Sequence, residues 1–169
     1  MGEQTSETAF DVVCYTDGGC RGNPGPGGWG FVVFNPQNGQ ALERCGGEKE
    51  TTNNRMEMMA AIMALRSLKK DGIRVLLYSD SQYLIKAVSE WMPGWKARGW
   101  KRKEGPLKNV DLLKELDVLN ARFAVTWRWV KGHSGNRGNE HVDALTNRAM
   151  DSVQAGKDAA YEGRLDWHA

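Results

Sequence analysis

The sequence has few cysteines, no long apolar run and no apolar leader. Its 169 residues include three cysteines, an odd number without Cys-x-x-Cys spacing, which argues against a disulfide framework and against a zinc site. No apolar run approaches the length that crosses a membrane, and residues 1–8 are polar, so we expect neither a membrane span nor a signal peptide. Together these absences predict a cytoplasmic protein with no membrane partner.

The chain also lacks a strong excess of charge of either sign. Its formal net charge is +2, and its contents of 40% hydrophobic and 26% charged residues are ordinary for a globular domain. Any binding of nucleic acid must therefore depend on how the charges are distributed. No internal repeat or linker is visible, so we expect one domain at residues 9–154. A disordered lead-in (residues 1–8) and a C-terminal tail (residues 155–169) flank it.

Hydrophobic periodicity predicts three strands followed by alternating helices and strands. The expected strands cover residues 10–16, 29–34, 40–48, 73–78 and 123–130. Asn38-Gly39 is typical of a hairpin turn, and the more polar strand after it is expected near a sheet edge. Helices are expected to begin near Asn53, Ser81, Asn109 and Asn139, with the two last residues as N-caps. This order predicts a mixed sheet with helices packed on it.

Four acidic residues lie where metal ligands would be needed. Asp17 and Asp80 each follow an apolar strand, Glu57 lies near a helix start, and Asp143 lies in the first turns of the last helix. If the strands before Asp17 and Asp80 are neighbours, these two carboxylates lie side by side at one sheet edge. Close carboxylates repel one another and need cations, and oxygen ligands favour Mg²⁺ or Mn²⁺. Two such ions suit phosphodiester cleavage.

Each acidic residue also has a purely structural interpretation. Asp17 begins an Asp-Gly pair, which is common in turns. Glu57 could close a capping box with Asn54. Asp80 could be an N-cap, and Asp143 could simply favour the positive end of its helix.

The segment from Trp91 to Lys108 mixes aromatic and basic side chains, with only Glu104 opposing them. Such interleaving is typical of a groove that follows a nucleic-acid backbone, although a solvated loop with an aromatic cluster has the same composition. A later glycine-rich loop carries His133. Alone, that residue is more typical of a surface histidine than of a catalyst.

Five motifs occur in a fixed order between about Phe10 and Met150. They are Asp17-Gly-Gly-Cys-x-Gly-Asn-Pro-Gly-Pro-Gly-Gly, Thr51-Thr-Asn-Asn-Arg-Met-Glu57, Ser79-Asp-Ser-Gln-Tyr83, Asn109-Val-Asp-Leu112 and Trp129-Val-Lys-Gly-His133. Together they closely resemble bacterial type 1 ribonuclease H. The resemblance implies a ribonuclease H-like α/β fold: a five-stranded mixed sheet, three antiparallel strands and then parallel strands, flanked by helices. It implies a monomeric endonuclease that uses two Mg²⁺ ions, or Mn²⁺, to cleave the RNA strand of RNA–DNA hybrids, leaving 5′-phosphate and 3′-hydroxyl ends.

The same resemblance implies a role for each candidate residue. By motif match the catalytic metal ligands are Asp17, Glu57, Asp80 and Asp143, and His133 resembles a mobile histidine that assists proton transfer or product release. The positions that read the minor groove of the hybrid correspond to Cys20, Asn23, Asn53, Asn54, Ser81 and Gln82. The groove and pocket for the DNA strand correspond to Thr52, Trp91, Trp95 and Asn109. The basic protrusion corresponds to Lys96, Arg98, Lys101, Arg102 and Lys103. Glu50 departs from the family, which often has an arginine there, so the phosphate pocket is expected to be weaker.

Two other functions compete with this hypothesis. A resolvase or transposase core would share the acids, but we would expect neither the Thr-Thr-Asn-Asn-Arg-Met-Glu run nor the basic tryptophan segment. A hybrid-binding module without catalysis would be expected to lose at least one acid, and all four are present. We therefore favour the hybrid-specific endonuclease.

Overall fold

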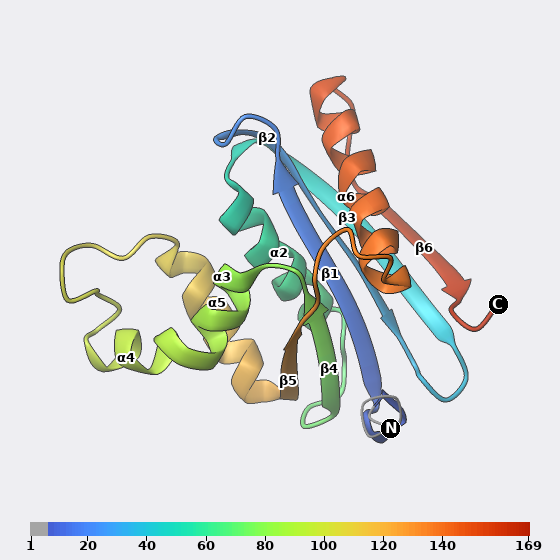
Figure 1. Cartoon of the computed structure of the whole chain (residues 1–169), viewed down its shortest axis with the longest axis horizontal. Helices are drawn as coiled ribbons and strands as arrows, with labels where there is room; N and C mark the ends of the chain where they lie inside the picture. The colour runs from blue at the N-terminus through green and yellow to red at the C-terminus, as the bar shows by residue number, and fades with distance from the viewer. Residues whose placement is uncertain (1–6) are drawn as a thin grey trace.

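A single mixed sheet organises the molecule. The computed structural model describes residues 7–169, so the expected lead-in lies mostly outside the described residues; its end, Glu7–Ala9 (η1), forms one 3-10 turn. The strands are β1 (Val12–Cys20), β2 (Gly25–Phe34), β3 (Gln40–Thr51), β4 (Arg74–Ser79), β5 (Ala124–Trp129) and β6 (Tyr161–Asp166). Their order is β5-β4-β1-β2-β3-β6 (Figure 1). The pairs β1–β4 and β4–β5 are parallel, and the other three are antiparallel, so the expected mixed α/β sheet is confirmed.

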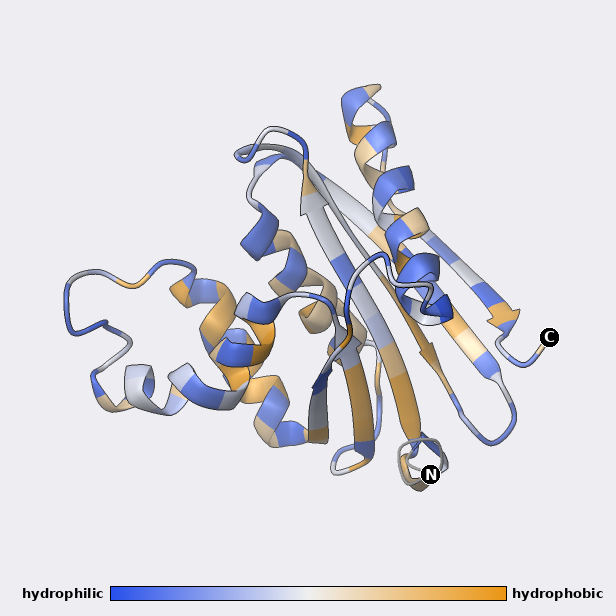
Figure 2. Cartoon of the chain, viewed as in Figure 1, coloured by the Kyte–Doolittle hydropathy of each residue, from blue (hydrophilic) through white to orange (hydrophobic). Residues whose placement is uncertain are grey.

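Helices cover both faces of this sheet. They are α2 (Asn53–Arg66), α3 (Gln82–Lys86), the π-helical turn η2 (Ala87–Trp91), α4 (Met92–Ala97), α5 (Val110–Arg122) and α6 (Arg137–Gln154). Along β1, Cys14 packs into one core with α2 and α5, whereas Val13 and Tyr15 pack into another with α6. Because successive strand residues face opposite sides, β1 and β4 must be apolar on both faces, as Figure 2 shows for their first halves. Among the described residues, no helix is long and apolar enough to cross a membrane.

The C-terminal tail corrects the expected strand count from five to six. Instead of remaining unassigned, Tyr161–Asp166 pairs with β3 in antiparallel register, so β3 is not an edge strand. Trp167, the next residue, is 7% exposed and belongs to the core beneath α6. Only three residues of β6 point inward, and one is glycine, so the strand has little hydrophobic pattern of its own. The backbone hydrogen bonds to β3 therefore stabilise this strand, which has few apolar side chains of its own.

Of the two predicted helix caps, Asn109 is at the N-cap position without a capping hydrogen bond from its side chain, and the prediction for Asn139 is wrong. Asn109 precedes α5 with a left-handed backbone (φ 64°), and its side chain caps no backbone N–H. Helix α6 is capped by Asn136, whose Oδ1 accepts a hydrogen bond from the backbone N–H of Asn139 at 2.8 Å. In both cases an asparagine side chain becomes available for a partner in another element.

Candidate active site

Three carboxylates gather at the C-terminal ends of β1 and β4. The parallel register pairs Thr16 with Ser79, which places the following residues, Asp17 and Asp80, side by side. Glu57 of α2 completes the group, and one carboxylate oxygen of each residue lies within 4.8 Å of the others. The expected adjacency of the two strands is therefore confirmed, and we call these three residues the carboxylate triad.

Helix α2 reaches the triad because β1 carries a glycine beside it. A Cβ on Gly18 would lie 2.3 Å from the carbonyl carbon of Met56 and 2.4 Å from the backbone nitrogen of Glu57, so the helix backbone occupies the space of a side chain. The N-cap of the helix is Thr52, whose Oγ1 accepts a hydrogen bond from the Arg55 N–H at 3.3 Å. The capping box that Glu57 could form with Asn54 is therefore absent. The Glu57 carboxylate lies near those of Asp17 and Asp80 instead.

Burial and mutual repulsion raise the pKa of two of these carboxyl groups, Asp17 and Glu57. Asp17 is 5% exposed. Burial, followed by the negative charges of Asp80 and Asp143, raises the pKa of Asp17 to about 8. Burial and the neighbouring Asp17 and Asp80 charges also raise the pKa of Glu57 well above its ordinary value. The Oε1 atom of Glu57 is buried and has no hydrogen-bond partner among the described residues. A buried oxygen without a donor is costly, and a bound cation would satisfy it.

Helix α6 brings a fourth carboxylate beside the triad. Asp143 is half-buried and close enough to raise the pKa of Asp17, although it lies outside the 4.8 Å group. Its Oδ2 accepts a hydrogen bond from Nδ2 of Asn147 at 3.3 Å. From the same helix, Nδ2 of Asn139 donates to Oδ2 of Asp80, also at 3.3 Å. The sequence offered Asn139 only as a cap, and its position one turn before Asp143 was the available signal for this contact.

His133 lies in the loop between β5 and α6. Its side chain is exposed, its backbone is left-handed (φ 56°), and its ring nitrogens lie outside the 4.8 Å group of ligand atoms. The preceding Gly132 packs against the triad, since a Cβ there would lie 2.8 Å from Oδ2 of Asp80. The loop is thus anchored beside the carboxylates while the imidazole extends into solvent. Its catalytic role stays a prediction.

The residues expected to read the hybrid surround the starts of α2 and α3. The backbone N–H of Asn53 donates to Oδ1 of Asn23 at 3.1 Å. The Cys20 thiol donates to the Thr51 carbonyl oxygen at 3.2 Å. Ser81 caps α3, so Asp80 itself is not the N-cap. Asn53, Asn54 and Gln82 are exposed. These contacts join the glycine-rich loop to both helix starts, and contact with nucleic acid stays a prediction.

A groove of about 530 Å³ lies between α3, α4 and the start of α5. The helix that begins after Ser81 continues from α3 through η2 into α4, which brings two tryptophans to one wall. The Trp91 ring is 38% exposed, and its centroid lies 5.9 Å from that of Tyr83 and 5.7 Å from that of Trp95. Asn54, Arg102, Lys108 and Asn109 also line the groove. The motifs assigned no role to Tyr83 or Lys108, although Lys108 belongs to the basic segment.

Arg55 connects α2 to this groove. Its Nη1 and Nη2 atoms donate to Oδ1 and Oδ2 of Asp111 at 3.1 and 2.8 Å, and Nη1 also lies 3.3 Å from Oδ1 of Asn109. The Asn109 amide donates in turn to the Tyr83 hydroxyl at 3.5 Å. This network fixes the groove relative to the helix that carries Glu57.

The basic segment divides into two parts. Residues 98–108 project away from the sheet (Figure 1), and Arg98, Lys101, Arg102 and Lys103 are exposed there. Lys96 instead forms an ion pair with Asp117 of α5 at 3.0 Å, in a separate hollow that Val88 and Met92 also line. Lys96 therefore lies apart from the aromatic groove.

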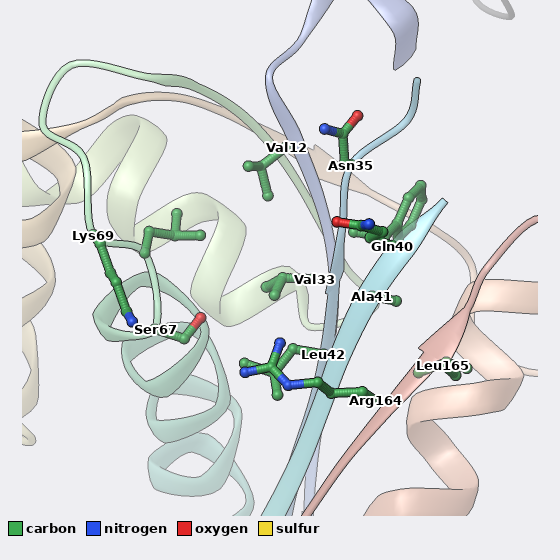
Figure 3. A pocket seen from close by; sticks show the side chains of 12 residues that line it. Val12, Val33, Asn35, Gln40, Ala41, Leu42, Ser67, Lys69, Arg164 and Leu165 are labelled. Atoms are coloured by element: carbon green, nitrogen blue, oxygen red, sulfur yellow. The ribbon is translucent and has the colours of Figure 1, made fainter. Parts of the chain in front are cut away.

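A second cavity, of about 620 Å³, opens at the other end of the sheet (Figure 3). Val12 at the start of β1, Leu42 of β3, Lys69 after α2 and Arg164 of β6 line it. Because Asp17 lies in the second half of β1, this cavity is separate from the carboxylate triad.

Similarity to known proteins covers most of the chain. The RNase H family model matches residues 9–151. Ribonuclease H of Cupriavidus necator is 53% identical over 144 residues (85% of this chain, 97% of the relative), and Ribonuclease HI of Caulobacter vibrioides is 55% identical over 140 residues (82% and 92%). Two solved structures are similar. LC9-RNase H1, a type 1 RNase H with the type 2 active-site motif, is 33% identical with a TM-score of 0.76, covering 92% of this chain and 76% of that one. LC11-RNase H1 in complex with RNA/DNA hybrid is 25% identical with a TM-score of 0.63, covering 85% and 99%.

Proposed function

The chain belongs to the RNase H family, and on that basis we propose that it hydrolyses the RNA strand of RNA–DNA hybrids with bound Mg²⁺. The observation that carries the proposal is the carboxylate triad beside the paired ends of two parallel strands, with Asp17 buried and Asp143 beside the triad. The hybrid bound to LC11-RNase H1 supports the choice of substrate. We propose that the protein acts as a monomer.

The donor set of the site fits hard divalent cations. All four side chains offer oxygen, and the buried Oε1 of Glu57 has no hydrogen-bond partner among the described residues. We propose that Asp17, Glu57, Asp80 and Asp143 hold two Mg²⁺ ions, for which Mn²⁺ can substitute. When bound, such a pair activates a water molecule and stabilises the leaving oxygen, which produces 5′-phosphate and 3′-hydroxyl ends.

The protein's own groups hold and orient this site. Asn139 donates to the Asp80 carboxylate and restricts its rotation. Gly18 admits the backbone of α2 and so brings Glu57 to the sheet edge. His133 extends from a loop anchored at Asp80, where we propose that its imidazole moves a proton or assists product release.

We propose that the hybrid lies across the starts of α2 and α3, with the RNA strand toward the triad. Hydroxyl, amide and thiol groups there can bond to 2′-hydroxyls and base edges in the minor groove; they belong to Cys20, Asn23, Asn53, Asn54, Ser81 and Gln82. The DNA strand follows the groove of Trp91 and Trp95, with Thr52 and Asn109 at its phosphates. The exposed cations of residues 98–103 extend this contact along the backbone.

Incubation of the protein with labelled hybrid, duplex DNA and duplex RNA tests the proposal. We expect only the hybrid to be cut, only on its RNA strand, and only without chelator. Asp17→Asn should fold and be inactive, whereas Asp71→Asn, which changes an exposed acid paired with Arg122, should cut normally. A folded Asp17→Asn variant with wild-type activity would contradict the assignment. Cleavage of duplex DNA would favour a resolvase-like or transposase-like activity.

A further inference from the structure

Trp167 connects the two elements that carry Asp17 and Asp143. Its indole is 7% exposed. The ring centroid lies 6.2 Å from that of Tyr15 in β1 and 5.1 Å from that of His141 in α6, the latter edge-on. Tyr15 precedes Asp17 by two residues, and His141 precedes Asp143 by two residues. A single side chain from the tail thus contacts the ring of a residue two positions before each of these carboxylates.

The first two turns of α6 rest on this indole and on the ring beside it. The guanidinium carbon of Arg137 lies 4.0 Å from the centre of the Trp167 ring, in cation–π geometry. One residue later, a Cβ on Gly138 would lie 2.4 Å from the Tyr15 ring, so helix and ring are in direct contact. Nε2 of His141 also lies 2.6 Å from Oε1 of Glu43. The start of the helix therefore packs on the Trp167 and Tyr15 rings, and its own Arg137 and His141 side chains make part of that contact.

The sheet, rather than α6, holds the indole in place. The backbone N–H of Trp167 donates to the Gly39 carbonyl oxygen at 2.7 Å, and its ring stacks on Phe34 at 5.1 Å. Before it, β6 pairs with β3 over its whole length, and the Tyr161 hydroxyl donates to Oε2 of Glu43 at 2.7 Å. The indole can therefore impose the position of the sheet on the start of α6.

We propose that Trp167 is a positioning residue, which sets the Asp143 carboxylate at its working distance from Asp17 and Asp80. The inference rests on the proposed function, because it takes Asp143 as a metal ligand. Trp167 lies beyond residues 9–151, which the family model matches, so no motif assigns it a role. Groups that orient metal ligands influence metal affinity. The hybrid groove at α3 and α4, by contrast, contains no residue of the tail. Loss of the indole should therefore weaken metal binding and leave hybrid binding unchanged.

The test compares Trp167→Ala, Trp167→Phe and Leu119→Ala in the full chain. Trp167→Ala should need about threefold to tenfold more Mg²⁺ for half-maximal cleavage, and should bind Mn²⁺ more weakly by calorimetry without substrate. Its affinity for hybrid in Ca²⁺ should match the wild type. Trp167→Phe keeps an aromatic ring and should restore metal binding. Leu119 is buried in the core on the other face, so Leu119→Ala should lower the Tm and leave the metal requirement unchanged.

A double-mutant cycle with Asp143→Asn isolates the mechanism. If Trp167 acts through Asp143, Trp167→Ala should weaken Mn²⁺ binding in the wild type but not in Asp143→Asn. Trp167→Ala with a lowered Tm and normal metal affinity would overturn the inference, as would equal losses in both backgrounds. Should Asp143→Asn itself leave metal binding unchanged, the proposed function fails instead. If Trp167→Ala does not fold, Trp167→Leu keeps apolar volume without the aromatic face and is compared in the same way.

Discussion

Asn139 of α6 donates a hydrogen bond from its amide to Oδ2 of Asp80, at 3.3 Å, across 59 residues of sequence. Asn139 is 3% exposed, and its backbone N–H is held by Asn136. Because Asn139 is buried and its backbone is held in place, its side-chain amide restricts the rotation of the Asp80 carboxylate. Helix α6 thus positions one carboxylate of the site and supplies another.

Asn139→Ala should weaken the metal site. The substitution leaves Oδ2 of Asp80 without this donor, and loss of such an orienting bond typically costs about 10- to 100-fold in metal affinity. Titration of cleavage with Mg²⁺ measures the effect. Asn120→Ala is the matched control. It also removes a side-chain amide that makes a hydrogen bond, here accepted from Trp127 Nε1 at 2.8 Å, but this bond involves no carboxylate of the triad. An unchanged Mg²⁺ requirement in Asn139→Ala would show that Asp80 needs no such support.

Asp17→Asn should stabilise the metal-free protein at high pH. The pKa of Asp17 is raised from 3.8 to about 8 in the folded state, so folding favours its protonated form. That contribution is fully present below pH 3.8 and is lost as the pH rises through 8. At pH 9 we expect the variant to unfold with a free energy more than about 1 kcal/mol above that of the wild type, and the difference should shrink toward acid. Chemical denaturation in chelator at several pH values measures it.

Asp11→Asn should change the stability of the protein in the opposite direction. Arg74 hydrogen-bonds the exposed Asp11 carboxylate and lowers its pKa, so its charged form favours folding above its ordinary pKa and less so as the pH falls. We expect this variant to be slightly less stable than the wild type at pH 9. The contradicting outcome for Asp17→Asn is a difference in free energy of unfolding, variant against wild type, that is the same at every pH. That result would mean that Asp17 is ionised in the folded, metal-free protein.

His133→Asn should slow turnover without abolishing it. Asparagine tolerates the left-handed backbone of this position (φ 56°) better than alanine, so the variant removes the imidazole with little added strain. A positioned acid–base group contributes about 10²- to 10⁴-fold, and the carboxylates remain in place. Equal turnover rates would leave His133 without a chemical role, and Ser134→Ala in the same exposed loop is the control.

Neutralising the exposed cations of the projecting segment should weaken hybrid binding in a salt-dependent way. We expect glutamine at Arg98, Lys101, Arg102 and Lys103 to raise KM with little change in kcat, since these residues lie away from the triad. Each lost phosphate contact should reduce the slope of log affinity against log salt by about 0.7 to 0.9. Titrations in Ca²⁺ at several salt concentrations measure the slope.

Two further variants serve as comparisons for the charge-neutralised segment. Lys96→Gln should have a smaller effect than any of the four exposed cations, because Lys96 is paired with Asp117. Trp91→Ala should weaken binding without flattening the slope, since stacking on its exposed ring involves no counterion release. If none of these variants changes hybrid affinity, the segment is a solvated loop.

Local sequence patterns predicted most of the strands and helices and the candidate carboxylates of the site. Apolar runs placed β1 and β4, and Asn38-Gly39 placed the turn before β3, because turn and strand preferences depend on near neighbours. Asp17 and Asp80 come directly after the last paired residues of β1 and β4, so the pairing of those strands was enough to bring the two acids together. The motif order then predicted Glu57 and Asp143 as the other two metal ligands.

Only the tertiary structure decided the partners that local sequence does not specify. Asn109 and Asn139 have ordinary cap sequences, yet their amides turn to Arg55 and Asp80, which lie in other elements. Lys96 is one cation in a basic run until Asp117 of α5 pairs with it. An amide or ammonium group can satisfy its hydrogen bonds in several ways, and the packed neighbour decides which one is used.

The tail shows the same division most clearly. By itself, the sequence determined only that residues 155–169 are polar, with a tryptophan near their end. The tertiary structure decided that Tyr161–Asp166 completes the sheet and that Trp167 enters the core beneath α6. A strand with little apolar pattern gains its stability from hydrogen bonds to β3, more than 100 positions earlier in the chain, and no local pattern records a pairing over that separation.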